Sequence, residues 1–117
     1  MTAVAEGNFS GKHLVVFGCG YVGAALAAQA VARGLRVTAL TRNAAKATLL
    51  REIGIEIVVA DLASADWHAR IAGAPEFAVN CVSSGGAGLD GYRRSYVEGM
   101  ASILTWAQRH GAPRTLA

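Results

Sequence analysis

The chain has few cysteines: only Cys19 and Cys81 occur among its 117 residues. A disulfide framework needs more cysteines, and a structural zinc ion needs about four ligands at compact spacing. We therefore expect both thiols to be small, reduced residues inside the fold, and we expect no metal site.

The chain also lacks a long uninterrupted apolar segment, although 53% of its residues are hydrophobic and its mean hydropathy is +0.34. Its uncharged stretches are broken by Gly, Asn or Ser, so none is predicted to span a membrane. The opening sequence MTAVAEGNFSGK has no basic flank followed by an apolar stretch, which argues against a secretory signal. We expect a cytoplasmic protein whose residues 1–12 form a flexible tail.

A concentrated basic surface is missing as well. The formal net charge is +3 and the isoelectric point is near 9.2, but the arginines and lysines are scattered along the chain. Because the sequence has neither a basic stripe nor interleaved aromatic residues, we expect no nucleic-acid partner. There is no internal repeat or low-complexity tract. The length fits one domain, over residues 13–117.

What the sequence does contain is a regular alternation of strand and helix patterns. Short apolar runs predict four strands, at His13–Phe17, Arg36–Leu40, Ile55–Ala60 and Glu76–Val82. The segments between and after them predict helices over Tyr21–Arg33, from the cap Asn43 to Ile53, from the cap Ser64 to Ile71, and over Tyr92–His110, with a loop over Ser83–Gly91. This alternation predicts an α/β fold with a parallel sheet of about four strands in the order 3-2-1-4 and helices on both faces.

Three glycines separate the first strand from the first helix, in the spacing G-x-G-x-x-G: Gly18, Gly20 and Gly23. In this context the first glycine permits a tight turn, the second removes a side chain that would block a pyrophosphate, and the third lets the helix lie close to the strand. Free backbone N–H groups at the helix start then face the phosphates. We therefore predict that the turn, including Cys19, Tyr21 and Val22, binds a dinucleotide. The alternative is that the glycines serve only the geometry of the turn.

The residues that end the second strand indicate which dinucleotide is bound. A carboxylate at this position accepts hydrogen bonds from the adenosine ribose and favours NAD, but here the chain has Thr41 followed by Arg42. An arginine can form charge-assisted hydrogen bonds to a 2′-phosphate, so NADP is predicted in preference to NAD. Asn43 and Lys46 are expected to contribute to that pocket. In the alternative reading, Arg42 is an ordinary exposed arginine that stacks on adenine.

Five segments in this order carry a resemblance to a known family: GCGYVGAALA, VTALTRN, VVADLAS, AVNCVSSGG and YRRSYVEGM. They resemble the amino-terminal half of short-chain dehydrogenase/reductase proteins. The resemblance implies that this half forms a truncated Rossmann fold. The resemblance is closest to the extended and atypical group labelled NAD-dependent epimerase/dehydratase, and it covers His13 to about Ala112. It implies that the Asp61 carboxylate and the Leu62 backbone lie at the adenine edge. It also implies that Cys81, Val82 and Ser83 border the ribose and pyrophosphate. Alternatively, Asp61 caps the Ser64 helix and Ser83 belongs to a turn.

The chain departs from the family pattern in three ways. Phe17 stands where the extended family usually has its first glycine, and Tyr96 stands where the family commonly has asparagine. The family also places a tyrosine with a lysine four residues later beyond the fifth strand, so that the lysine lowers the tyrosine pKa for proton exchange. Here Tyr92 is followed four residues later by Tyr96, and the chain reaches only GAPRTLA, where a fifth strand would begin. We therefore predict no catalytic residue.

No other chemistry is predicted, because the three histidines, His13, His68 and His110, lie on different predicted elements and are expected at the surface or at strand edges. Three functions stay open. The first is an NADP(H)-binding module without a complete active site, and the second is a fragment or subunit of a reductase or epimerase. The third is a structural remnant that binds no nucleotide. We further expect a homodimer formed through the open edge of the fourth strand or through the final helix.

Overall fold

The computed structural model describes residues 11–71, 75–82, 88–110, 113 and 115–117. Five parallel strands form one sheet in the order β3-β2-β1-β4-β5. The strands are β1 (His13–Phe17), β2 (Arg36–Thr41), β3 (Glu56–Val59), β4 (Phe77–Asn80) and β5 (Thr115–Leu116). The predicted α/β class and the predicted order 3-2-1-4 are confirmed, and a fifth, two-residue strand adds to the sheet.

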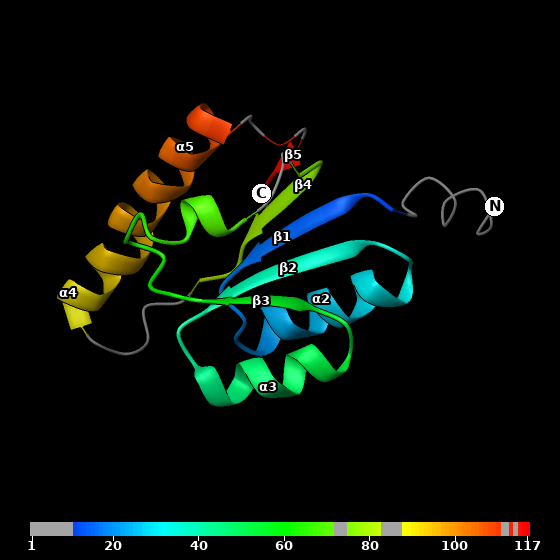
Figure 1. Ribbon diagram of the computed structural model, residues 1–117. Helices are drawn as coiled ribbons and strands as arrows, with labels where there is room; N and C mark the ends of the chain where they lie inside the picture. Colours follow the sequence, from blue (N-terminus) through cyan, green and yellow to red (C-terminus); the bar gives the residue numbers. More distant parts are fainter. Residues whose placement is uncertain (1–10, 72–74, 83–87, 111–112, 114) are drawn as a thin grey trace.

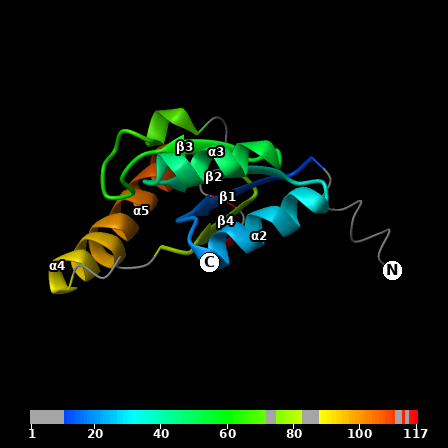
Figure 2. The same ribbon diagram turned by 90° about the horizontal axis from the view of Figure 1, so that it is seen from below.

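Helices cover both faces of the sheet, as predicted. Figures 1 and 2 show α2 (Tyr21–Ala32) and α3 (Ala44–Glu52) on one face, while the 3₁₀ turn η1 (His68–Arg70) and α5 (Gly99–His110) lie on the other. The chain leads into α5 through α4 (Gly88–Tyr92) and η2 (Arg93–Glu98), which has π-helical hydrogen bonding. None of the helices in the described residues is both long and apolar enough to cross a membrane.

The register of the strands brings their carboxyl ends to one edge of the sheet. Phe17 at the end of β1 pairs with Leu40 of β2 and with Asn80 of β4, and Thr41 of β2 pairs with Val59 of β3. The segments that follow β1, β2, β3 and β4 therefore emerge side by side. In open parallel sheets this edge is where ligands bind.

The first helix is rich in alanine, which has high helix propensity and a small side chain. Small side chains let α2 lie close to β1, with Ala27 and Ala30 buried against the sheet. The helix ends at Ala32, and Gly34, the residue predicted to end it, follows with a φ of 87° in the left-handed region that favours glycine. On α3, the predicted cap is also confirmed, since the Asn43 side chain accepts a hydrogen bond from the Lys46 backbone N–H at 3.0 Å.

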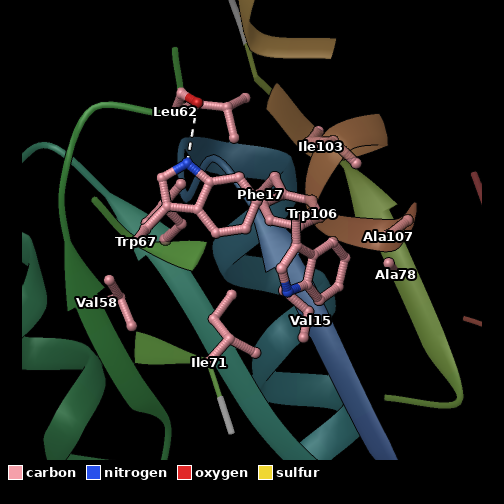
Figure 3. Close-up of a cluster of buried hydrophobic side chains, with 11 residues drawn as sticks. Val15, Phe17, Val58, Leu62, Trp67, Ile71, Ala78, Ile103, Trp106 and Ala107 are labelled. Atoms are coloured by element: carbon pink, nitrogen blue, oxygen red, sulfur yellow. Dashed lines mark hydrogen bonds between the residues drawn. The ribbon is translucent and has the colours of Figure 1, made fainter. Parts of the chain in front are cut away.

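The larger core lies under α5 and η1 and is built around three aromatic rings (Figure 3). The Phe17 ring centroid is 5.1 Å from that of Trp67 and 5.5 Å from that of Trp106, and all three side chains are fully buried. Burying a ring of this size stabilises the fold by about 2 to 3 kcal/mol. The Trp67 indole N–H donates to the Leu62 carbonyl at 3.0 Å. Phe17 therefore packs in the centre of this core, and the tight turn is made by the next residue, Gly18.

The helix predicted from Ser64 to Ile71 is wrong, because the structure has only the 3₁₀ turn η1 there. The Ser64 hydroxyl donates to the Asp61 carbonyl at 2.8 Å and accepts from the Asp66 N–H at 3.4 Å, so local side-chain bonds replace helical ones. The Trp67 ring is buried in the core against the sheet. The path of this segment is therefore determined by the packing of Trp67 and not by helix propensity.

The final helical region begins earlier than predicted. Residues Gly88–Tyr92 form α4 instead of the end of a loop, whereas residues 83–87 lie outside the described residues. The π-helical η2 then leads into α5 at Gly99, where a Cβ would lie 2.9 Å from the Leu62 side chain. A glycine at this junction lets the helix pass closely over Leu62.

The expectation of an open edge at the fourth strand is wrong. β5 pairs with β4 in the register Phe77↔Thr115 and Ala78↔Leu116. The Ala117 N–H donates to the Ala78 carbonyl at 2.9 Å, and the Asn80 N–H donates to the Ala117 carbonyl at 2.7 Å. These bonds satisfy the backbone of β4 on that side, so this edge is not available to pair with a second copy.

Of the tail expected over residues 1–12, the first ten lie outside the described residues. Gly11 and Lys12 are described and extend the sheet region: the Gly11 N–H donates to the Gly34 carbonyl at 3.0 Å, and the Arg36 N–H donates to the Lys12 carbonyl at 2.8 Å. These backbone bonds hold the start of β1 beside the start of β2.

Candidate functional site

The turn after β1 requires glycine at two of its three glycine positions. Gly18 has a φ of 88°, and a Cβ there would lie 2.8 Å from Val82. A Cβ at Gly23 would lie 2.1 Å from the Gly18 carbonyl oxygen, closer than any real contact. The fold itself therefore explains Gly18, which makes the tight turn, and Gly23, which lets α2 approach β1.

The fold does not explain Gly20. Its φ of −75° and ψ of −156° are accessible to any residue, and a Cβ there would meet no atom of the described residues within 4 Å. Gly20 is exposed and is the residue that immediately precedes α2. An open, side-chain-free surface at this point is what a closely approaching phosphate requires.

The amino end of α2 has an unused capacity to bind an anion. Among the residues that the structure describes, no side chain caps this end, and its first turn contains no acidic residue. The backbone N–H groups of Tyr21, Val22 and Gly23 have no carbonyl partner one turn earlier in the helix, as in the first turn of every helix. The positive end of the helix dipole adds to their attraction for an anion. α3 differs, because Asn43 caps its first turn. The residues at α2 therefore fit a phosphate group.

The residue directly after β2 is a cation, Arg42, and not a carboxylate. Thr41 is buried, and its hydroxyl accepts a hydrogen bond from the Asn43 N–H at 3.1 Å. Arg42 is exposed, and within the described residues its guanidinium has no hydrogen-bond partner. Lys46, one helical turn along α3, lies close enough to Cys19 that its charge opposes the rise in that thiol's pKa. Lys46 thus lies near the glycine turn, and Arg42 follows the end of β2, whose Leu40 carbonyl accepts from the Gly18 N–H at 3.0 Å.

The segment after β3 brings Asp61 to the same edge. Its Oδ1 accepts from the Ala63 N–H at 3.0 Å, and its Oδ2 accepts from the Arg94 guanidinium, with Nε at 2.9 Å. Burial alone would raise the pKa of Asp61. These hydrogen bonds, together with the charges of Arg94 and Arg42, outweigh burial and hold the pKa below its ordinary value. Asp61 is therefore a stable carboxylate.

The resemblance implied a backbone contact for Leu62, and the structure shows the Leu62 side chain buried in the core while its carbonyl accepts from Trp67. After β4, the Cys81 N–H donates to the Phe17 carbonyl at 2.7 Å, and the Val82 N–H donates to the Asn80 side chain at 3.1 Å. Cys81 and Val82 thereby lie beside the glycine turn. Ser83 lies outside the described residues.

Both cysteines are free thiols inside the fold, as predicted: Cys19 is buried and Cys81 is half-buried. Burial, together with the neighbouring Cys81, raises the pKa of Cys19 to about 11, against the opposing charge of Lys46. Burial also raises the pKa of Cys81. Both thiols therefore stay protonated near neutral pH, which makes them poor nucleophiles. Within the described residues no group of three or more His, Cys, Asp and Glu side chains could hold a metal ion.

His13 and His68 were expected at the surface or at strand edges, and both are buried. His13 is the first residue of β1, whereas His68 is in no strand, so the expectation is wrong for His68. His13 hydrogen-bonds through Nε2 to the Thr38 hydroxyl at 2.7 Å, at the amino ends of the strands and away from the glycine turn. The Nε2 atom of His68 lies 2.8 Å from the hydroxyl oxygen of Ser102. That hydroxyl donates to the Ser64 carbonyl at 2.7 Å, so His68 does not receive its proton and the pair is not an activated nucleophile. The side chain of His110 is not described.

Arg94 is a functional candidate that the sequence did not indicate. It is 33 residues from Asp61 in the chain and lies in η2. No spacing in the sequence connects an exposed arginine on a helix with a carboxylate after a strand, so the pairing could be found only in three dimensions.

The comparisons with known proteins agree with this geometry. A protein of Bacillus halodurans assigned as an NAD-dependent epimerase/dehydratase has 27% identity and a TM-score of 0.76 over 91% of this chain and 50% of that one. A UDP-galactose 4-epimerase matches with 23% identity and a TM-score of 0.69, over 89% of this chain and 36% of that one. L-sorbose reductase from Gluconobacter frateurii, solved with NADPH and L-sorbose, matches with 18% identity and a TM-score of 0.69, over 86% and 46%.

The chain therefore spans between 36% and 50% of the length of these three structures. No curated protein sequence matches it. The predicted resemblance to epimerase/dehydratase proteins is confirmed, and the two structures of lower identity share the fold. The NAD(P)H-binding family matches residues 18–117, from the first glycine of the turn to the last residue. The chain thus belongs to the NAD(P)H-binding family and corresponds to the cofactor-binding part of such proteins.

Proposed function

We propose that the chain binds NADP(H) in preference to NAD(H) and that it has no complete active site of its own. The observation that carries the proposal is the uncapped amino end of α2 behind Gly20, where a glycine is present although the fold does not require one. A dinucleotide pyrophosphate explains both features, because it needs free N–H donors and a path clear of side chains.

We place the pyrophosphate against the turn formed by residues 18–23, with Cys81 and Val82 along its border. The closeness of Val82 to Gly18 supports this arrangement, since it brings the end of β4 to the turn. Asp61 and the Leu62 backbone would lie at the adenine edge, beyond β3. Ser83 would follow Val82 along the ribose and pyrophosphate.

The preference for NADP(H) rests on Arg42. Its exposed guanidinium follows β2 directly, at the position where a carboxylate would favour NAD. Lys46 adds a second cation, while Asn43 and Thr41 hold the local backbone and leave the two cations to meet a 2′-phosphate. NADPH in the L-sorbose reductase structure is consistent with this choice.

A bound nicotinamide dinucleotide supplies hydride transfer, and the residues of this chain would bind and orient it. The sequence has no tyrosine with a lysine four residues later, so we propose that the chain alone catalyses no turnover. As an alternative, a further segment or a partner subunit completes the active site of a reductase or epimerase. The chain spans at most 50% of the length of the three solved structures, which is a reason to test that alternative. The cytoplasmic location stays a prediction.

We propose further that two copies associate through the final helical region. Four large apolar side chains of this region are exposed: Leu89, Tyr96, Val97 and Leu104. The sequence suggested two dimer surfaces, the edge of β4 and the final helix. Because β5 pairs with β4, the final helical region is the one that remains. Multi-angle light scattering tests the proposal: a dimer mass supports it, and a monomer mass across the accessible concentration range refutes it.

The binding proposal is tested by titrating the protein with NADPH and with NADH while tryptophan fluorescence is recorded. Trp67 and Trp106 are the only tryptophans, and both pack on Phe17, which directly precedes the turn. A bound reduced nicotinamide should therefore quench their emission by energy transfer. We expect NADPH to bind at least about tenfold more tightly, a difference of about 1.4 kcal/mol. Equal affinities would refute the NADP preference, and quenching by neither dinucleotide would favour a structural remnant.

A further inference from the structure

Arg94 and Asp61 form an ion pair near Arg42, the residue proposed to bind a 2′-phosphate. Asp61 follows β3, and Arg42 follows β2. The two segments stay together because the Ala60 N–H donates to the Thr41 carbonyl at 3.0 Å, and the charge of Arg42 helps to lower the pKa of Asp61. The carboxylate therefore lies close to the cation that is proposed to bind the 2′-phosphate.

An unpaired carboxylate beside Arg42 would oppose the binding of a phosphate. It would attract the arginine for itself and repel the dianionic group, and both effects disfavour NADP(H) relative to NAD(H). The contribution of Arg42 to specificity thus depends on what neutralises Asp61.

Arg94 is placed to neutralise the charge of Asp61. Its Nε lies 2.9 Å from Asp61 Oδ2, and its Nη2 donates to the same oxygen. The guanidinium also lies 3.8 Å from Glu98 on its own helix, a longer and weaker contact. The pair joins the segment after β3 to η2, on the opposite side of the sheet from α2 and α3.

The exposure of the pair argues against a mainly structural role. Half of the Arg94 side chain and 32% of the Asp61 side chain are accessible to solvent. Ion pairs exposed to this degree contribute little to the free energy of folding. Replacing Arg94 should therefore leave the fold intact, so that an effect on ligand choice can be measured.

We infer that Arg94 is a positioning residue for cofactor specificity: by pairing with Asp61 it leaves Arg42 available to the 2′-phosphate of NADP(H). This inference rests on the proposed NADP(H) preference. Arg94 acts through Asp61 and is not required to touch the dinucleotide. The readout that separates this role from general stabilisation is the ratio of the two dissociation constants, for NADH and for NADPH.

The test compares four variants with the wild type in the same fluorescence titration. Arg94→Gln removes the charge that pairs with Asp61. Arg93→Gln is the matched control, because it removes an exposed arginine from the adjacent position of η2 that makes no ion pair with Asp61 in the described residues. Arg94→Lys keeps the charge. The double variant Asp61→Asn with Arg94→Gln removes both partners.

We expect the preference for NADPH to fall on the order of tenfold in Arg94→Gln. The preference should be unchanged in Arg93→Gln, largely retained in Arg94→Lys and restored in the double variant. Equal weakening of both dinucleotides by Arg94→Gln, an equal loss in Arg93→Gln, or no recovery in the double variant would each overturn the inference. Failure of the proposed function itself looks different, since the wild type would then show no preference for NADPH at all.

Discussion

Gly23 packs against the backbone of Gly18 so closely that a Cβ at position 23 would lie 2.1 Å from the Gly18 carbonyl oxygen. We predict that Gly23→Ala destabilises the protein by about 1 to 3 kcal/mol, because the added methyl group forces α2 away from β1. Urea denaturation followed by tryptophan fluorescence measures the change. An unchanged free energy of unfolding would show that the turn relaxes at no cost, contrary to the tight packing described.

At Gly20, in the same turn, a substitution is expected to affect binding and not stability. Gly20→Val adds a side chain whose Cβ meets no atom in the part of the chain that the structure describes, and the backbone angles at this position suit any residue. We therefore predict nearly unchanged stability in urea but loss of detectable NADPH binding. Unimpaired binding would mean that the space beside Gly20 is not used by the dinucleotide, whereas a large loss of stability would mean that the turn is tighter than the structure indicates.

Arg42→Ala tests the preference for NADP(H). Loss of charge-assisted hydrogen bonds to the 2′-phosphate should weaken NADPH binding by about 1 to 3 kcal/mol and should weaken NADH binding much less. Arg33→Ala is the control, because Arg33 is equally exposed but stands at the far end of α2. If Arg42→Ala weakens both dinucleotides equally, Arg42 does not bind the 2′-phosphate.

Much of this fold could be predicted because its signals are local. Alanine-rich α2 ends at a glycine, α3 begins at a capping asparagine, and four apolar runs form strands in the predicted order. The glycine turn was also recognisable, because its spacing falls between a strand and a helix. These features depend on residues that are neighbours in the chain.

The features that were missed depend on contacts between distant residues. The family resemblance placed the start of a fifth strand at GAPRTLA, but β5 has only two residues and no alternating pattern, so its pairing with β4 was not predicted. The path of the segment after Asp61 is set by burial of Trp67, and not by helix propensity. Arg94 reaches Asp61 across 33 residues, and π-helical hydrogen bonding in η2 has no sequence signature that could be used.

The burial of His13 makes the stability of the protein depend on pH. Burial, with the nearby charge of Arg36, lowers the pKa of His13 below its usual 6.5, although Glu56 and Glu76 act in the opposite direction. The folded state then binds fewer protons than the unfolded state once the pH falls below about 6.5. The contribution of neutral His13 is therefore complete above that pH and is lost as the pH falls toward the lower folded-state pKa.

We accordingly predict a loss of stability between about pH 7 and pH 5, with a slope from His13 of at most about 1.4 kcal/mol per pH unit. Urea midpoints measured across this range test it, with His13→Gln as the comparison. The variant has no imidazole to titrate and should show a shallower dependence over the same interval. Identical slopes in the two proteins would show that His13 does not control this transition.

We propose that the uncapped amino end of α2 holds the phosphates of a dinucleotide. A series of ¹⁵N–¹H correlation spectra, recorded while NADPH is added to the labelled protein, tests this placement. We expect the largest amide shift changes over residues 19–23, with smaller changes at Arg42 and Val82. Changes centred on another surface, or saturation of binding without any change in these amides, would contradict it.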